Sequence, residues 1–388
     1  MIEHLKQEFE KIFHETGELR YFFAPGRVNL IGEHIDYNGG YVFPTALDVG
    51  TYIAVRKRSD RKLRFYSENF PQMGIVEGDL DHLAYSASDD WVSYAKGVLS
   101  MFEEQGMTGE AGFDVYVFGN IPNGAGLSSS ASIELAFAVM WDALNGFSMD
   151  RVTMVKLCQR AENEYIGVNC GIMDQFAIGF GKKEHAVLLD CDTLDYEYAR
   201  LKLDGCKILI ANTNKRRGLA DSKYNERREE CETALSELQG EQTVSHLCEL
   251  DEAAFQKASH LIKDTDRLKR ARHAVTENER TKQAFRALEE GDLSAFGQLM
   301  NASHVSLRDD YEVTGKELDA MVEAAWQEDA VIGARMTGAG FGGCTVNIVK
   351  ENGLDETIKR ISQRYTDRTG IEPKFYVVTT GDGAKELT

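Results

Sequence analysis

The sequence predicts an α+β fold divided into two domains. Strand-like segments come in pairs and helix-like segments in clusters, which favours α+β over a regular alternation of strand and helix. The 388 residues, 43% of them hydrophobic, exceed the size at which a single core stops growing. From residue 221 to about 299 the chain changes to long, charged, helical segments. We therefore expect a first domain over residues 1–190 and a second over 191–388, with a soft boundary near 185–200.

The first half opens with a helix and continues in short strands. Apolar residues at helical spacing predict an amphipathic helix over residues 2–13. Alternating and β-branched patterns predict strands, and longer periodic segments predict helices. The expected strands are 20–23, 41–43, 51–55, 62–67, 113–118 and 186–189, and the expected helices are 91–104, 133–144 and 152–165.

The second half begins with a buried-looking strand and then becomes helical. A strand is expected over 207–211, helices over 221–299, strands within 331–349 and a last strand over 374–379. Repeats and low-complexity tracts are absent from the sequence, and its five prolines mark no linker. The two domains are therefore expected to pack closely.

Composition excludes several classes of function. The 44 Lys and Arg against 63 Asp and Glu give a net charge of −19, which argues against a nucleic-acid or anionic-membrane partner. The seven cysteines form no C-x-x-C pair, which indicates reduced thiols rather than zinc or a disulfide framework. No signal peptide is recognised and no apolar run approaches ~20 residues. We expect a soluble cytoplasmic protein with no obligate protein partner.

A glycine- and serine-rich loop, Pro122 to Ser132, lies between the strand ending at Phe118 and the next helix. Glycines permit backbone angles and close approaches that a Cβ would forbid. The helix that follows presents unpaired N–H groups and a positive dipole end, which attract an anion. The Walker string G-x-x-x-x-G-K-[ST] and the protein-kinase strings H-R-D and D-F-G are absent from the sequence. By itself the loop is compatible with phosphate binding or with a structural turn.

A polar stretch, residues 24–40, places Arg27, Glu33, His34 and Asp36 among glycines. Loops this dense in ligand-capable side chains commonly bind a ligand. A sugar suits this chemistry because carboxylates accept hydrogen bonds from its hydroxyls. A metal site of Glu33, His34 and Asp36 is the weaker alternative, because adjacent side chains point in different directions.

Two further segments are candidates for the site. Residues 169–176 contain Asp174 in largely apolar surroundings, where a capping or solvent-facing role is the alternative. The glycine cluster 338–343 precedes a strand. It is either a tight turn or a backbone wall that lets a ligand, or the first loop, approach closely.

Taken together and in this order, these segments resemble the three motifs of the GHMP kinase superfamily and, more closely, the galactokinase family. Residues 26–38, GRVNLIGEHIDYN, match the galactokinase signature, residues 122–131 the nucleotide motif and residues 336–343 the third motif. Residues 303–313 also look like the family, and the resemblance covers essentially the whole chain. Ile35 stands where a Thr is common, which a side chain pointing away from the sugar would tolerate.

The resemblance implies a two-domain GHMP kinase fold. The N-terminal domain would be like domain 2 of ribosomal protein S5, the C-terminal domain α+β, and the substrates would lie in the cleft between them. The implied reaction is transfer of phosphate from ATP, with Mg²⁺, to the anomeric hydroxyl of galactose. Its products would be galactose 1-phosphate and ADP, in the first committed step of galactose catabolism.

The resemblance also implies roles for individual residues. Asp174 would accept the proton of the anomeric hydroxyl or mainly orient it, and Arg27 would favour the ionised form of that carboxyl. The implied galactose-binding residues are Glu33, His34, Ile35, Asp36, Asp174 and Tyr224. The implied ATP-binding residues are Ser67, Gly124, Ala125, Gly126, Leu127, Ser128, Ser129 and Ser130. Ser130 and Glu162 would hold the magnesium ion.

Two alternatives remain from the sequence. Other GHMP kinases, acting on mevalonate, homoserine or N-acetylgalactosamine, share the nucleotide loop but not the whole first signature. A non-catalytic sensor of galactose and ATP, working through a protein partner, is the alternative from another class. The complete serine loop and the presence of Asp174 argue against the sensor.

Overall fold

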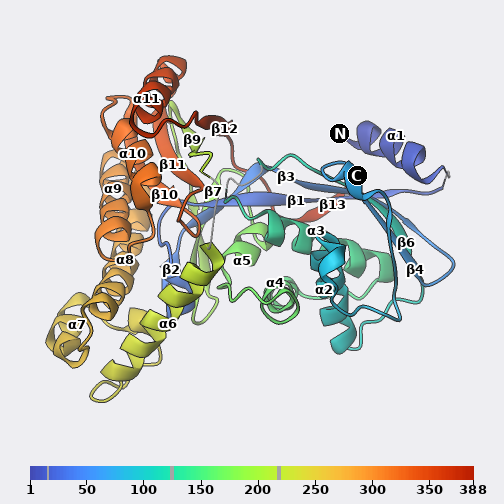
Figure 1. Ribbon diagram of the computed structural model, residues 1–388, viewed down its shortest axis with the longest axis horizontal. Helices are drawn as coiled ribbons and strands as arrows, with labels where there is room; N and C mark the ends of the chain where they lie inside the picture. Colours follow the sequence, from blue (N-terminus) through green and yellow to red (C-terminus); the bar gives the residue numbers. More distant parts are fainter. Residues whose placement is uncertain (15–16, 123–125, 216–219) are drawn as a thin grey trace.

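The described part of the chain forms three β-sheets with helices packed around them (Figure 1). The computed structural model describes residues 1–14, 17–122, 126–215 and 220–388. Its strands are β1 (Arg20–Asn29), β2 (Tyr41–Val42), β3 (Pro44–Lys57), β4 (Lys62–Ser67), β5 (Val76–Asp79), β6 (Phe113–Gly119), β7 (His185–Asp190), β8 (Tyr196–Arg200), β9 (Cys206–Asn212), β10 (Val331–Thr337), β11 (Cys344–Lys350), β12 (Lys374–Val378) and β13 (Lys385–Leu387). Its α-helices are α1 (Ile2–Phe13), α2 (Val92–Glu104), α3 (Ser129–Asn145), α4 (Arg151–Arg160), α5 (Met173–Gly179), α6 (Ala220–Leu238), α7 (Glu252–Ala258), α8 (Thr265–Glu290), α9 (Leu293–Asp309), α10 (Gly315–Trp326) and α11 (Leu354–Thr369).

The largest sheet has the strand order β13-β1-β3-β6-β4-β5. Helix α1 covers one face, and Figure 1 shows α2 and α3 on the opposite side. The apolar stripe of α1, Leu5, Phe9 and Phe13, is buried there against β3 and β6. Both termini lie at this sheet, because the last strand, β13, pairs with β1.

The second sheet, in the order β10-β11-β9-β12, carries helices α10 and α11 on one face. A core cluster on its other face joins β9 and β11 to α8, α9, β7 and the second half of β1. The third sheet is a small one, β2-β7-β8. The two large sheets are thus linked through a continuous apolar core, which holds their loops in fixed relation to each other.

A bulge in β1 prepares the site. The register between β1 and β3 shifts between Pro25 and Arg27, and such a bulge re-aims the next side chain. The backbone N–H of Arg27 donates to the carbonyl of Leu127 at 3.1 Å. A Cβ on Gly26 would lie 2.9 Å from that same carbonyl. Only glycine therefore allows the strand to approach the glycine- and serine-rich loop, the candidate phosphate loop, this closely.

Most elements predicted from the sequence are confirmed, and the α+β class with them. Helix α3 begins at Ser129, four residues before the predicted start, and β1 and β3 are longer than predicted. The helix predicted over 152–165 is α4 followed by a π-helical turn, Ala161–Ile166. The short strands β5, β8 and β13 and the helices α5, α10 and α11 were not predicted as separate elements. The domain boundary near residue 190 stays a prediction.

The described helices include none with both the length and the apolar character needed to cross a membrane.

Candidate active site

A cavity of about 390 Å³ lies where the three predicted motifs meet. The candidate phosphate loop lines one side, the polar stretch of residues 24–40 lines another, and the glycine cluster 338–343 closes it at Gly338 and Ala339. Of the residues predicted for the site, those on its lining are Arg27, Glu33, His34, Asp36, Gly126, Leu127, Ser128, Ser129, Ser130, Glu162, Asp174 and Tyr224.

Asp174 and Arg27 form the central ion pair of this cavity. Asp174 lies in the first turn of α5, and Arg27 follows the β1 bulge. Arg27 Nε and Nη2 donate to the two carboxylate oxygens of Asp174 at 2.7 and 2.9 Å. The guanidinium is buried, whereas the Asp174 side chain keeps 29% of its surface exposed. A bidentate pair fixes the plane of the carboxylate and leaves one side of it open to the cavity.

The phosphate loop contributes to holding Asp174. Ser128 has a left-handed backbone, φ +60°, and its Oγ donates to Asp174 Oδ2 at 2.5 Å. Arg27 Nη1 donates to the carbonyl of Gly126 at 2.8 Å. Helix α3 starts at the next residue, Ser129, so its first N–H groups face the cavity as an anion-binding end. The same few residues therefore connect the candidate phosphate site with the candidate catalytic carboxylate.

Three acidic side chains lie close enough to raise one another's pKa: Glu134, Glu162 and Asp174. Gln175 Nε2 donates to Glu162 at 2.8 Å and to Glu134 at 3.0 Å, which brings the two carboxyls together. Burial, and then the negative charge of Asp174, raise the pKa of Glu162 to about 7. Burial and the charge of Glu162 hold the pKa of Glu134 well above its usual range.

The donor set suits a divalent cation. The Ser130 hydroxyl lies near Glu162, where it favours the ionised carboxylate, and both side chains line the cavity. A hydroxyl and a carboxylate are hard oxygen ligands of the type that magnesium takes. The buried Oε1 of Glu134 has no hydrogen-bond partner among the described residues, and a nearby cation would favour the ionised forms of these two carboxyls.

Asp36 lies across the cavity from the loop. The backbone N–H groups of Tyr37 and Met173 favour its ionised form. Burial first, and then the charges of Asp174 and Glu33, raise its pKa to about 7. A partly buried carboxylate that lines a polar cavity is a good acceptor for ligand hydroxyls.

His34 has both ring nitrogens engaged within the protein. Nε2 bonds to the carbonyl of Ala339 at 3.2 Å, and Nδ1 to the hydroxyl of Tyr37 at 2.9 Å. The ring lies against Tyr311 and Tyr224, with centroids 4.9 and 5.5 Å away. Burial is the main cause that lowers the pKa of His34 to about 3, so the imidazole is neutral.

Glu33 is held by a partner from far along the chain. Its Oε2 accepts from Nη2 of Arg335 at 2.7 Å, and both side chains are almost fully buried. Arg335 lies on β10 and also donates to the carbonyl of Asn29 at 2.8 Å. Strand β10, which precedes the glycine cluster 338–343, thereby fixes the orientation of the Glu33 carboxylate.

Some predicted site residues do not reach the cavity or cannot be placed. Ile35 is fully buried in the hydrophobic core and is not on the cavity lining, in keeping with a side chain that points away from a sugar. Ser67 is also absent from the lining, and its Oγ accepts from the backbone N–H of Asn69 at 3.2 Å. Gly124 and Ala125 lie outside the described residues.

Sequence reasoning missed several residues that shape the site. Tyr94 of α2 lines the cavity, and Glu134, Gln175 and Arg335 hold its acidic groups. Glu134 carried a signal, because a charged residue at the start of an otherwise apolar helix needs a partner. Arg335 carried none, since its partner Glu33 is some 300 residues away.

Comparison with known families agrees with this geometry. Residues 7–57 match the family described as the galactokinase galactose-binding signature. Residues 93–182 match the GHMP kinase N-terminal domain, and residues 284–367 the GHMP kinase C-terminal domain.

Curated relatives and solved structures extend the likeness to the whole chain. A galactokinase of Fusobacterium nucleatum is 57% identical over 388 residues, covering 100% of both chains. A galactokinase of Bacillus subtilis is 53% identical over 387 residues, covering 100% of this chain and 99% of that protein. The crystal structure of Lactococcus lactis galactokinase complexed with galactose superposes with a TM-score of 0.98, at 47% identity and full coverage of both chains.

A more distant structure shares the fold. Mevalonate kinase of Methanococcus jannaschii matches with a TM-score of 0.69 at 18% identity, covering 95% of this chain and 100% of that one. The fold is therefore that of the GHMP kinases in both halves. The chain belongs to the galactokinase family.

Proposed function

We propose that the protein transfers the γ-phosphate of ATP to the anomeric hydroxyl of α-D-galactose, giving galactose 1-phosphate and ADP. This is the first committed step of galactose catabolism, the Leloir pathway. The observation that carries the proposal is the position of Asp174. Its carboxylate, held at both oxygens by Arg27, lies between the phosphate loop and the polar stretch that contains Asp36.

Phosphoryl transfer requires mainly positioning and charge stabilisation from the protein. In our proposal the anomeric hydroxyl donates to Asp174, which orients it toward the phosphate and accepts its proton. Arg27 stabilises the negative charge that passes between the hydroxyl and the carboxylate, because it bonds to both oxygens of Asp174. General-base assistance of this kind is worth ~10²–10⁴ in rate.

The donor side is proposed to bind the triphosphate through the backbone. The loop from Gly126 to Ser130 leads into the N-terminus of α3, whose N–H groups are fixed before ATP arrives. Ser128 bonds to Asp174, so we assign it a second contact besides the nucleotide. This contact would keep the base and the phosphate loop in register.

Ser130 and Glu162 are proposed to hold Mg²⁺. A magnesium ion bound there would supply neutralisation of the charge on the phosphate oxygens. Gln175 would keep the Glu162 carboxylate directed at the cavity through its 2.8 Å bond. Ser130 would present its hydroxyl from the first turn of α3.

The acceptor side is proposed to recognise galactose. Asp36 and Glu33 would accept from sugar hydroxyls, with Arg335 fixing the orientation of Glu33. His34 and Tyr224 would present their rings to the sugar from the cavity lining. We place the reaction in the cytoplasm, where ATP is available, and propose no nucleic-acid, membrane or obligate protein partner.

A coupled assay of ADP release tests the proposal. The wild-type protein with MgATP should release ADP when galactose is added, and much less with mevalonate, homoserine or N-acetylgalactosamine. Asp174→Asn should lower kcat by ~10²–10⁴ and leave the Kd of galactose nearly unchanged, because Asn keeps the shape and loses the base. Wild-type turnover in Asp174→Asn would remove the catalytic assignment, and absence of ADP release with galactose would contradict the function itself.

A further inference from the structure

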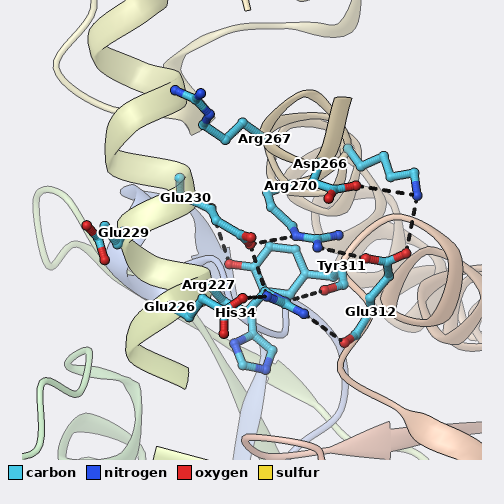
Figure 2. A network of polar contacts seen from close by, with 12 residues as sticks. His34, Glu226, Arg227, Glu229, Glu230, Asp266, Arg267, Arg270, Tyr311 and Glu312 are labelled. Carbon is cyan, nitrogen blue, oxygen red and sulfur yellow. Dashed lines mark hydrogen bonds and ion pairs between the residues drawn. The ribbon is translucent and has the colours of Figure 1, made fainter. Parts of the chain in front are cut away.

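Two buried arginines meet behind the aromatic residues of the acceptor side (Figure 2). Arg227 comes from α6 and Arg270 from α8, and their side chains are only 9% and 2% exposed. Taking a guanidinium out of water is costly unless its donors are paired. The groups that accept hydrogen bonds from these two arginines must therefore offset the cost of burying them.

The partners are the backbone of one short turn. Arg270 Nη1 donates to the carbonyl of Asp310 at 2.6 Å, and Arg227 Nε to the carbonyl of Tyr311 at 2.9 Å. Arg227 Nη2 donates to the carbonyl of Glu312 at 3.3 Å. Three consecutive carbonyls between α9 and α10 are thus bound by two side chains from two other helices.

Three carboxylates complete this group, and Glu226 Oε1 accepts from Arg227 Nη1 at 3.3 Å. Glu230 Oε2 accepts from Arg270 Nε at 2.8 Å and from Arg227 Nη1 at 3.1 Å. Glu312 Oε2 accepts from Arg270 Nη2 at 2.7 Å, as Figure 2 shows. We call Arg227 and Arg270, with these bonds, the arginine clamp. It ties α6, α8 and the turn together.

The turn needs an external restraint. Glu312 has φ +56°, in the left-handed region that a residue with a Cβ adopts only under strain. Such a conformation persists only where the surroundings impose it. The clamp bonds to the carbonyl of Glu312 and to its carboxylate, and so acts on the strained residue itself.

Tyr311, the middle residue of this turn, restrains His34. Tyr311 is fully buried, its ring lies 4.9 Å from that of His34, and its hydroxyl bonds to the hydroxyl of Tyr37 at 2.7 Å. Because the carbonyl of Ala339 can only accept, Nε2 of the neutral His34 carries the hydrogen and Nδ1 accepts from Tyr37. Tyr37 must then accept from Tyr311, so the whole chain of bonds has one direction and selects one tautomer.

We propose that Arg227 and Arg270 are positioning residues of the acceptor site. They hold the turn Asp310–Glu312 so that Tyr311 fixes the orientation and tautomer of His34. Arg227 also lies one helical turn after Tyr224 on α6, whose ring is 5.5 Å from His34, so the clamp restrains that wall of the cavity too. This inference rests on the proposed function, because it assigns His34 and Tyr224 to the sugar.

Helix α8 offers a matched control. Arg267 also reaches from α8 to α6, where Nη1 donates to Glu237 at 2.9 Å. Figure 2 shows Arg267 pointing away from the turn. Arg267→Met therefore removes a cross-helix ion pair without touching residues 310–312. Arg270→Lys keeps a positive charge and loses the fork that binds Asp310, Glu230 and Glu312 at once.

The experiment measures galactose binding by calorimetry without nucleotide, and separately the KM for ATP. Arg270→Lys should raise the Kd of galactose about tenfold, while the KM for ATP stays within about twofold. Arg267→Met should change neither. An unchanged Kd in Arg270→Lys would overturn the proposal, as would an equal loss in Arg267→Met or an equal loss of both ligands.

A second variant decides the case if Arg270→Lys shows no cooperative thermal unfolding. Tyr311→Phe keeps the ring against His34 and removes only the hydroxyl that orders Tyr37. It should weaken galactose at least about threefold, and unchanged affinity would overturn the proposal. Wild-type protein that neither binds galactose nor releases ADP in its presence would instead contradict the proposed function, so the two failures are distinguishable.

Discussion

At the scale of single residues, the acceptor side depends on carboxyl groups that the fold buries wholly or in part. Asp36 keeps part of its surface exposed, yet burial and the negative charges of Asp174 and Glu33 raise its pKa to about 7. A group that titrates near neutral pH changes the ligand affinity over an accessible range.

The affinity for galactose should therefore depend on pH through Asp36. In the proposed function the carboxylate accepts from sugar hydroxyls above about pH 7, and it is mostly protonated below. Between pH 8 and pH 6 its ionised fraction falls by about tenfold, so the Kd of galactose should rise by up to that factor as pH falls. Calorimetry across this range, without nucleotide, measures the change.

Asp36→Asn is the control for this titration. Its galactose affinity should be lower than that of wild type at pH 8 and nearly independent of pH, because the amide does not titrate. A wild-type Kd that stays flat from pH 8 to pH 6 would show that Asp36 is not the controlling group. An Asn variant with the wild-type slope would show the same.

The sequence pointed to individual site residues wherever a motif lies within one short stretch. Arg27, His34 and Asp174 were all named from such stretches, and the structure brings them to one cavity. Arg335, Tyr311 and the arginine clamp were not, because their partners are distant in sequence and set by tertiary packing. Buried charge pairing needs the fold before it can be seen.

At the scale of elements, the helices at the site differ most from the sequence pattern. The predicted start of helix α3 was too late, because the prediction relied on the apolar residues of the helix. Ser129 to Ser132 show little periodicity but form its N-terminal turn. The π-helical turn at Ala161–Ile166 interrupts a pattern that predicted one continuous helix. Such turns are frequent at functional sites, and this one carries Glu162.

The connection from this turn to α5 leads to a steric prediction. A Cβ on Gly171 would lie 1.9 Å from Asp36 Oδ2. The φ of Gly171 is outside the left-handed region, so an alanine there is excluded by this steric contact and not by backbone strain. Gly171→Ala should displace the Asp36 carboxylate and raise the KM for galactose by about tenfold or more, with the KM for ATP nearly unchanged. Steady-state kinetics with each substrate varied in turn measure this split.

Gly240→Ala is the matched control, because the nearest heavy atom to its Cβ would be a carbonyl 3.4 Å away. It should leave both KM values as in wild type. If Gly171→Ala raised both KM values equally, the change would have deformed the whole cavity rather than the position of Asp36. Wild-type galactose kinetics in Gly171→Ala would mean that the contact is relieved without moving the carboxylate.

At the scale of the whole molecule, the sheet order could not be predicted from local patterns. The strand segments were mostly recognised, yet the pairing of β13 with β1 joins the last residues of the chain to the first sheet. A three-residue strand has too few positions for alternation to register. The segment pattern predicted the α+β class and the resemblance implied the two-domain fold, whereas the long-range pairings came only from the structure.

The segment that leads into β13 also supports α5, the helix that carries Asp174. The N–H groups of Gly383 and Ala384 donate to the carbonyls of Gly181 and Ile178, at 2.7 and 2.9 Å, at the end of α5. Ala384 is itself buried in the main core. The terminal segment therefore acts as an edge strand and as an anchor for α5 together.

Removal of residues 383–388 should destabilise the protein. The lost backbone bonds and burial are worth roughly 3–4 kcal/mol in unfolding free energy, at ~1 kcal/mol for each hydrogen bond. For a chain of this size that corresponds to a Tm lower by about 4–5 °C, measured by calorimetry. Glu386→Gln removes only the ion pair with Arg20, whose side chains are 34% and 36% exposed, and should lower the Tm by no more than about 2 °C. A truncated protein with the wild-type Tm would show that β13 adds nothing to the sheet. If Glu386→Gln alone reproduced the loss, the stabilisation would come from the ion pair rather than from the backbone pairing that we infer.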